Sequence, residues 1–150
     1  MNIKGDVLVV IVGANGFIGS KLRNYFNKKK YSTLSLIREK NRNFNIKKNK
    51  SFFFYDEKSL PTTLGIPKFL KKNSFLKKKI IIINAAGFAH KSLIDEDIKK
   101  EQRNFLQALL NDCLTLKSNL VHISSISARE KTTYSNFKYH AYSELKKEAE

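Results

Sequence analysis

Apolar runs alternate along the chain with segments whose apolar residues recur at helical spacing. The continuous and alternating runs predict strands at residues 7–12, 31–37, 51–56, 77–87 and 119–125. Helical spacing predicts helices from Phe17 to about Lys29 and over 92–116, with a further helix beginning at 142. Strands that alternate with helices indicate an α/β fold, with a doubly wound parallel sheet covered on both faces.

The segments between these elements complete the predicted order. The stretches 38–50 and 57–76 are polar, and the second contains both prolines, so we expect loops with at most one short helix. The first helix is expected to bury one apolar face, formed by Phe17, Ile18, Leu22, Tyr25 and Phe26.

Length and composition point to one globular domain over residues 1–150. The longest apolar runs, 7–12 and 80–83, are too short to span a bilayer, and the N-terminus lacks the pattern of a signal peptide. Cys113 is the single cysteine, which excludes internal disulfides and fits a reducing compartment. We therefore expect a cytoplasmic protein with no membrane partner.

The formal net charge of +16 raises the question of an anionic partner. The lysines occur in separate groups along the sequence, without interleaved stacking residues or a nucleic-acid-binding motif. We therefore expect no nucleic-acid partner. A basic nucleic-acid-binding protein is the least favoured function, and it would show steeply salt-dependent binding.

Three glycines, Gly13, Gly16 and Gly19, follow the first strand at a spacing of three residues. A dinucleotide pyrophosphate needs backbone N–H groups and the positive end of a helix close to it, and a side chain at such a turn blocks the approach. The alternative is a tight strand-to-helix turn without a ligand. Position after the first strand of a βαβ series favours the cofactor. We expect Gly13→Val to abolish dinucleotide binding and to leave the fold largely formed.

The end of the second strand bears on the choice between NAD and NADP. NAD sites usually place an acidic residue there, whereas this chain has Arg38 followed by Glu39. An arginine suits the 2′-phosphate of NADP, although a solvated charge at a strand end explains it equally well.

Four motifs occur in a characteristic order: GANGFIGS (13–20), NAAGFAH (84–90), HISSISA (122–128) and YSELKKEAE (142–150). With them the chain resembles the extended short-chain dehydrogenase/reductase family, and more narrowly its NAD-dependent epimerase/dehydratase branch, which acts on nucleotide sugars. The resemblance implies a Rossmann-like sheet and an NAD or NADP cofactor, with no metal. It implies the cofactor-binding residues Gly13, Asn15, Gly16, Phe17, Ile18, Gly19, Arg38, Asp56, Ala85, Ala86, Gly87, Ser124, Tyr142 and Lys146.

Some of these positions keep a second interpretation. Asp56 matches a family aspartate near the adenine, but a turn-forming aspartate fits equally. His90 is interpreted as a loop histidine with a structural hydrogen bond, and Asn104 matches a common family asparagine in the long helix.

The resemblance also implies the catalytic residues Ser125, Tyr142 and Lys146. A tyrosine and a lysine four apart share one helical face, so the ammonium can lower the phenol's pKa from about 10 toward neutrality. The pair Tyr134 and Lys138 has the same spacing. We favour Tyr142 because the helix that follows it also matches the family.

Family members are about twice as long as this chain. We therefore expect the N-terminal part of an NAD(P)-dependent epimerase, dehydratase or reductase for a nucleotide-linked sugar. We expect it to lack the last strands and the substrate domain, to be inactive alone, and to form a homodimer when intact. The alternatives are a non-catalytic dinucleotide-binding module, either a sensor or a structural subunit, and an inactive truncated product.

Overall fold

The computed structural model describes residues 6–38, 52–55, 62–76, 78–87 and 96–123. These ranges contain five strands and three helices in the predicted order, namely β1 (Val7–Val12), α1 (Phe17–Lys28), β2 (Ser32–Arg38), β3 (Phe52–Tyr55), α2 (Ile66–Lys72), β4 (Lys79–Asn84), α3 (Glu96–Leu116) and β5 (Asn119–His122). The predicted strands are confirmed, and the one short helix allowed within 57–76 is α2, which contains Pro67 in its first turn. The helix expected from residue 142 lies outside the described ranges.

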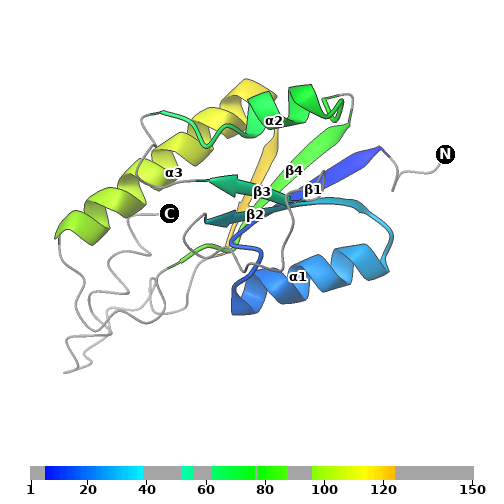
Figure 1. Cartoon of the computed structure of the whole chain (residues 1–150), viewed down its shortest axis with the longest axis horizontal. Coiled ribbons are helices and arrows are strands. Elements are labelled where there is room, and N and C mark those ends of the chain that lie inside the picture. Colours follow the sequence, from blue (N-terminus) through cyan, green and yellow to red (C-terminus); the bar gives the residue numbers. More distant parts are fainter. Residues whose placement is uncertain (1–5, 39–51, 56–61, 77, 88–95, 124–150) are drawn as a thin grey trace.

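All five strands are parallel and lie in the order β3-β2-β1-β4-β5. The chain moves outward from β1 through β2 to β3, crosses to β4 on the other side of β1, and continues to β5. Helix α1 covers one face of the sheet, and α2 and α3 cover the other (Figure 1). The predicted α/β fold with a Rossmann-like sheet is confirmed, and the strand order reverses between β1 and β4.

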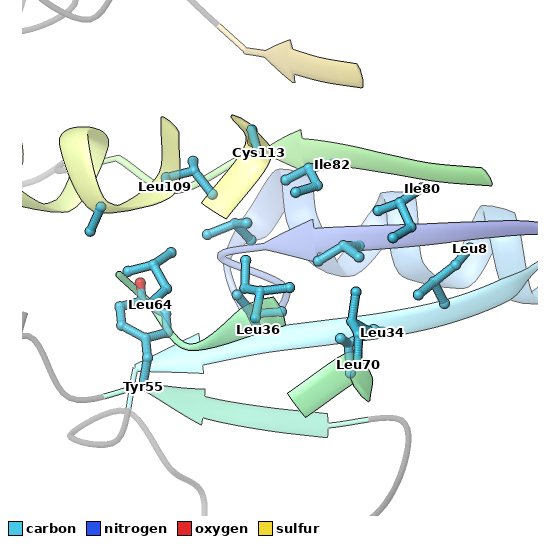
Figure 2. Close-up of a cluster of buried hydrophobic side chains, with 14 of the residues drawn as sticks. Leu8, Leu34, Leu36, Tyr55, Leu64, Leu70, Ile80, Ile82, Leu109 and Cys113 are labelled. Carbon is cyan, nitrogen blue, oxygen red and sulfur yellow. The ribbon is translucent and has the colours of Figure 1, made fainter. Parts of the chain in front are cut away.

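The core consists of two apolar clusters, one on each face of the sheet. Side chains of β1 alternate between them: Leu8, Val10 and Val12 point toward α2 and α3, whereas Val9 and Ile11 point toward α1. The larger cluster joins β1, β2 and β4 to residues of α2 and α3, including Leu70 and Leu109 (Figure 2). No helix in the described part of the chain is long and apolar enough to cross a bilayer.

The apolar face predicted for α1 is only partly correct. Leu22 and Phe26, three and seven residues after the buried Gly19, pack against the sheet. Phe17, Ile18 and Tyr25 are instead 83%, 46% and 56% exposed. The helix approaches the sheet through Gly19. Ile18 and Tyr25 lie roughly 100–120° around the helix from this glycine and Phe17 roughly 160°, so all three point away from the contact.

All three helices end in the same kind of turn, with a non-glycine residue in the left-handed region. These residues are Lys30 (φ 62°), Ser74 (φ 59°) and Lys117 (φ 48°). After α1, the Lys30 N–H donates to the Asn27 carbonyl at 2.9 Å and the Tyr31 N–H donates to the Phe26 carbonyl at 3.0 Å. Helix termini of this type favour glycine at the left-handed position, because any Cβ is strained there.

Lys30→Gly and Lys117→Gly are therefore expected to raise the free energy of unfolding, each by about 0.5–1 kcal/mol. Relief of left-handed strain outweighs the added flexibility of the unfolded chain. Urea denaturation followed by circular dichroism measures the change. Lys21→Gly, the same substitution inside α1, is the control and should lower stability by about 1 kcal/mol. A lower stability for both left-handed positions would contradict the prediction.

Candidate functional site

The glycine turn joins β1 to α1 at the carboxyl edge of the sheet, beside the point where the strand order reverses. The N–H groups of Gly13 and Ala14 both donate to the Leu36 carbonyl of β2, at 3.1 and 3.2 Å. The Gly16 N–H donates to the Gly13 carbonyl at 2.9 Å. The turn is thus held against β2 by two hydrogen bonds and is stabilised internally by a third.

Internal packing explains two of the three glycines. Gly13 has φ +75°, and a Cβ there would lie 2.8 Å from the backbone N and Cα of Ala86. A Cβ on Gly19 would lie 2.1 Å from the Gly13 carbonyl oxygen. Both positions exclude a side chain whether or not a ligand is bound. The expectation that Gly13→Val leaves the fold largely formed therefore needs correction, because valine at this position collides with the backbone of Ala85 and Ala86, which directly follow β4.

Gly16 differs from the other two glycines. It is exposed, its backbone is extended (φ −72°, ψ 172°), and a Cβ would meet only the Gly13 carbonyl oxygen, at 3.2 Å. It is the N-cap of α1, so the N-cap itself offers no side chain, and the first turn contains no acidic residue. Neither the N-cap nor the first turn of α1 therefore offsets the positive end of the helix.

A buried amide holds the opposite wall of the site. Asn84, 1% exposed, closes β4, and its Oδ1 accepts the Ala86 N–H at 3.1 Å. Its Nδ2 lies 3.0 Å from Nδ1 of His122 in β5. Because Oδ1 already faces a donor, Nδ2 is the donor to the His122 ring. The amide thus fixes the Ala85–Ala86 segment against Gly13, and it links this segment to the end of β5.

Sequence reasoning did not single out Asn84 or His122. The available signal was a polar residue that ends an otherwise apolar run, IIIIN at residues 80–84. A buried amide at such a position has to find hydrogen-bond partners, and here the partners come from the next loop and from the neighbouring strand.

The remaining predicted site residues within the described ranges lie around this turn. Asn15, Phe17 and Ile18 are exposed at the start of α1, Ala85 and Ala86 are half-buried, and Gly87 is exposed. Arg38 ends β2, two residues after the Leu36 carbonyl that holds the turn, and it is partly buried. Asn104 lies on an exposed position of α3. The structure therefore brings Gly13, Ala85 and Ala86 into direct contact and places Arg38 on the adjacent strand end.

The predicted chemical residues fall outside the described ranges. These are Asp56, His90, Ser124, Ser125, Tyr142 and Lys146, together with the alternative pair Tyr134 and Lys138. Strand β5 ends at His122, two residues before the serines. Their roles stay predictions.

A buried carboxylate in the second half of α3 was also missed. Asp112, 1% exposed, accepts the backbone N–H groups of Leu64 at 3.1 Å and Ile66 at 3.0 Å, and the hydroxyl of Thr63. Burial raises the pKa of Asp112 above its ordinary value, and the hydrogen bonds from Thr63 and the backbone partly oppose this. Asp112 therefore fixes the start of α2 to α3 rather than serving the glycine turn.

A family model described as the NAD dependent epimerase/dehydratase family matches residues 9–139, which leaves Tyr142 beyond the match. A search of curated protein sequences finds no significant match.

Solved structures with the same fold are more distant in sequence. A yeast methylglyoxal/isovaleraldehyde reductase complexed with NADPH is 19% identical, with a TM-score of 0.67 over 95% of this chain and 50% of its own. An aldohexose dehydrogenase from Thermoplasma acidophilum is 18% identical, with a TM-score of 0.63 over 96% and 57%. A Brucella ovis short-chain dehydrogenase/reductase in complex with a partially ordered NAD is 14% identical, with a TM-score of 0.61 over 95% and 72%.

The chain thus spans about half the length of the first two of these proteins. The fold likeness extends over nearly the whole chain, and the family match covers more than half of it, including the glycine turn and the end of β4. The chain belongs to the NAD-dependent epimerase/dehydratase family.

Proposed function

We propose that the carboxyl edge between β1 and β4 binds NAD or NADP, with the dinucleotide pyrophosphate at the first turn of α1. The observation that carries this proposal is Gly16. Packing within the chain accounts for Gly13 and Gly19, but it leaves Gly16 exposed at a helix start whose N-cap has no side chain and whose first turn has no acidic residue. Close approach of a phosphate to the helix N–H groups accounts for a missing side chain at that position.

The surrounding residues fit such a ligand. Ala85 and Ala86 present small side chains beside Gly13, so the end of β4 leaves room for a flat group to lie across the strand ends. Solved relatives of the same fold carry NADPH in one case and NAD in another, which supports a nicotinamide dinucleotide and leaves the 2′-phosphate open. Arg38 at the end of β2 favours NADP.

We further propose that the chain is the cofactor-binding part of an enzyme that acts on a nucleotide-linked sugar. The cofactor, when bound, supplies hydride transfer. Tyr142 would remove a proton from a sugar hydroxyl that Ser125 positions, while Lys146 would lower the pKa of the phenol and hold the ribose. The aldohexose dehydrogenase among the solved relatives supports a sugar-like substrate.

Gly16→Val is expected to weaken NAD(P) binding at least about 100-fold while preserving the fold, because the valine side chain occupies the space of the pyrophosphate. The extended backbone at Gly16 accepts any residue without left-handed strain. Calorimetric titration with NAD⁺ and NADP⁺ measures affinity, and urea denaturation reports on the fold. Titration of the wild-type chain with both compounds also decides the phosphate preference.

Asn24→Val is the matched control, since Asn24 is exposed on the same helix a little over two turns further on. It should leave both affinities unchanged. Undiminished binding by Gly16→Val, or no binding by the wild-type chain, would overturn the cofactor site.

Catalysis is tested separately, with the longest open reading frame that contains residues 1–150. Turnover of UDP-sugars that is lost in Tyr142→Phe supports the enzyme. Tight cofactor binding without turnover would instead support a non-catalytic dinucleotide-binding module.

A further inference from the structure

The fold gathers lysines that are far apart in the sequence at the amino-terminal edge of the sheet. All three helices end at this edge, and strands β2, β4 and β5 begin there (Figure 1). The helix ends, the connections and the start of β4 at this edge contain lysines at 28–30, 71–72 and 78–79, and Lys117. The Lys78 ammonium donates to the Ser32 hydroxyl at 2.6 Å, which joins two of these connections directly.

The charge at this edge is almost entirely of one sign. Seven of these eight lysines are exposed, and Lys78 is half-buried. Asp6, beside the start of β1, is exposed among these lysines, whereas Asp112, four residues before the end of α3, is buried. The acidic residues Asp97 and Glu101 lie in the first half of α3, which starts at the opposite edge. The amino-terminal edge therefore presents a concentrated positive field.

Fold stability does not explain all of these lysines. Lys28 and the pair at 71–72 lie in last helical turns, where a cation offsets the negative end of the helix. Lys30 and Lys117 lie beyond the helix ends with positive φ, where glycine would suit the backbone better. Lysine is thus present at two positions where the left-handed backbone conformation disfavours every residue with a Cβ.

Exposed apolar side chains lie within the same surface. Leu76, in the connection between α2 and β4, is 47% exposed. Tyr25, near the end of α1, is 56% exposed, and the Lys29 ammonium lies 6.0 Å from the centre of its ring. Apolar groups that project among lysines are typical of surfaces that bind the headgroup region of a bilayer.

We propose that the amino-terminal edge of the sheet docks on the surface of an anionic phospholipid bilayer. The charges are all lysines, compact point charges suited to a diffuse layer of headgroups, whereas nucleic-acid recognition relies on the planar fork of arginine and on rows of stacking aromatics. The docked orientation leaves the glycine turn on the far edge of the sheet. The proposal therefore does not depend on cofactor binding.

Sedimentation with vesicles tests this surface on the full 150-residue chain. We expect binding to vesicles of equal parts phosphatidylcholine and phosphatidylglycerol at low salt, little binding to phosphatidylcholine alone, and loss at high salt. The double variant Lys30→Gly/Lys117→Gly should lower the partition coefficient roughly 10- to 30-fold. Misfolding cannot explain that loss, because both substitutions are expected to stabilise the chain. Leu76→Ser should lower the partition coefficient by a further several-fold.

The control Lys21→Gln/Lys100→Gln removes the same net charge at exposed positions near the other edge. With both double variants compared at about 0.1 M salt, it should change the partition coefficient less than threefold, since charges beyond a Debye length of about 10 Å are then screened. An equal loss in both double variants would overturn the proposal, as would no binding to the anionic vesicles. Binding to single-stranded RNA without binding to vesicles would also overturn it, in favour of a nucleic acid.

Discussion

Replacing Gly19 by alanine is expected to lower the free energy of unfolding by about 4 kcal/mol or more, which is most of the stability of a domain at the lower end of the usual range of about 5–15 kcal/mol. The added Cβ would lie 2.1 Å from the Gly13 carbonyl oxygen and 2.8 Å from its carbon, and both belong to backbone that is hydrogen-bonded to its surroundings. No rotamer can relieve a clash made by Cβ itself. Helix α1 would have to move away from β1 and lose its contact with the smaller core cluster.

Urea denaturation of Gly19→Ala and Gly16→Ala, compared with the wild-type chain, measures this effect. Gly16 lies one turn earlier, and its Cβ would meet only one atom, at 3.2 Å. Alanine there should change stability by less than about 1 kcal/mol. Equal midpoints for the two variants would show that α1 approaches the sheet less closely than described.

Replacing Asp112 by leucine is expected to lower the free energy of unfolding by about 3–5 kcal/mol, because the buried N–H groups of Leu64 and Ile66 lose their shared acceptor. Asparagine should lower it by about 1 kcal/mol or less. Its Oδ1 can accept both N–H groups, and its Nδ2 can donate to the Thr63 hydroxyl, which already accepts the Gly65 N–H at 2.9 Å. Asparagine thus mimics the protonated acid. Equal losses for the two variants would contradict this account.

The difference in stability between the wild-type chain and Asp112→Asn should depend on pH, with a definite sign. The pKa of Asp112 is raised in the folded state, so the folded chain holds this proton more tightly than the unfolded chain. The contribution of Asp112 to stability is therefore present below its unfolded pKa of 3.8 and is lost as the pH rises through the folded value. The stability of the wild-type chain relative to Asp112→Asn should fall from pH 4 toward neutrality. A rise in this relative stability between pH 4 and neutrality would show that folding lowers the pKa of Asp112 instead of raising it.

The sequence predicted the fold well because its strongest signals are local. Residues 7–12 and 80–83 are continuous β-branched or aliphatic runs, and each forms a buried central strand as expected. The face of α1 was misjudged because apolar spacing cannot show that a glycine forms the contact. The glycine turn was found, but only the backbone around Ala86 separates the structural role of Gly13 from the ligand-dependent role that we propose for Gly16.

Other features could not be predicted because they depend on contacts between distant residues. Asp112 is 46 to 48 residues from the two N–H groups that it accepts, and nothing in either segment identifies the other. The lysine groups looked unrelated along the sequence for the same reason, since each helix that joins two parallel strands ends at the edge where the next strand begins. The proposed proton-transfer residues lie beyond β5, outside the described ranges, so their arrangement rests on motif resemblance.

The Asp112 contact also sets an order of assembly. Helix α2 has only seven residues, and its N-cap, Gly65, has no side chain to hold the first turn. A helix so short is unstable in isolation, and the groups that secure its start come from α3. During synthesis on the ribosome, α2 therefore emerges well before the residue that completes it. We therefore expect the crossover from β3 to β4 to be completed only after α3 has formed. The half of the sheet formed by β1, β2 and β3 should then pair with β4 and β5 late in folding.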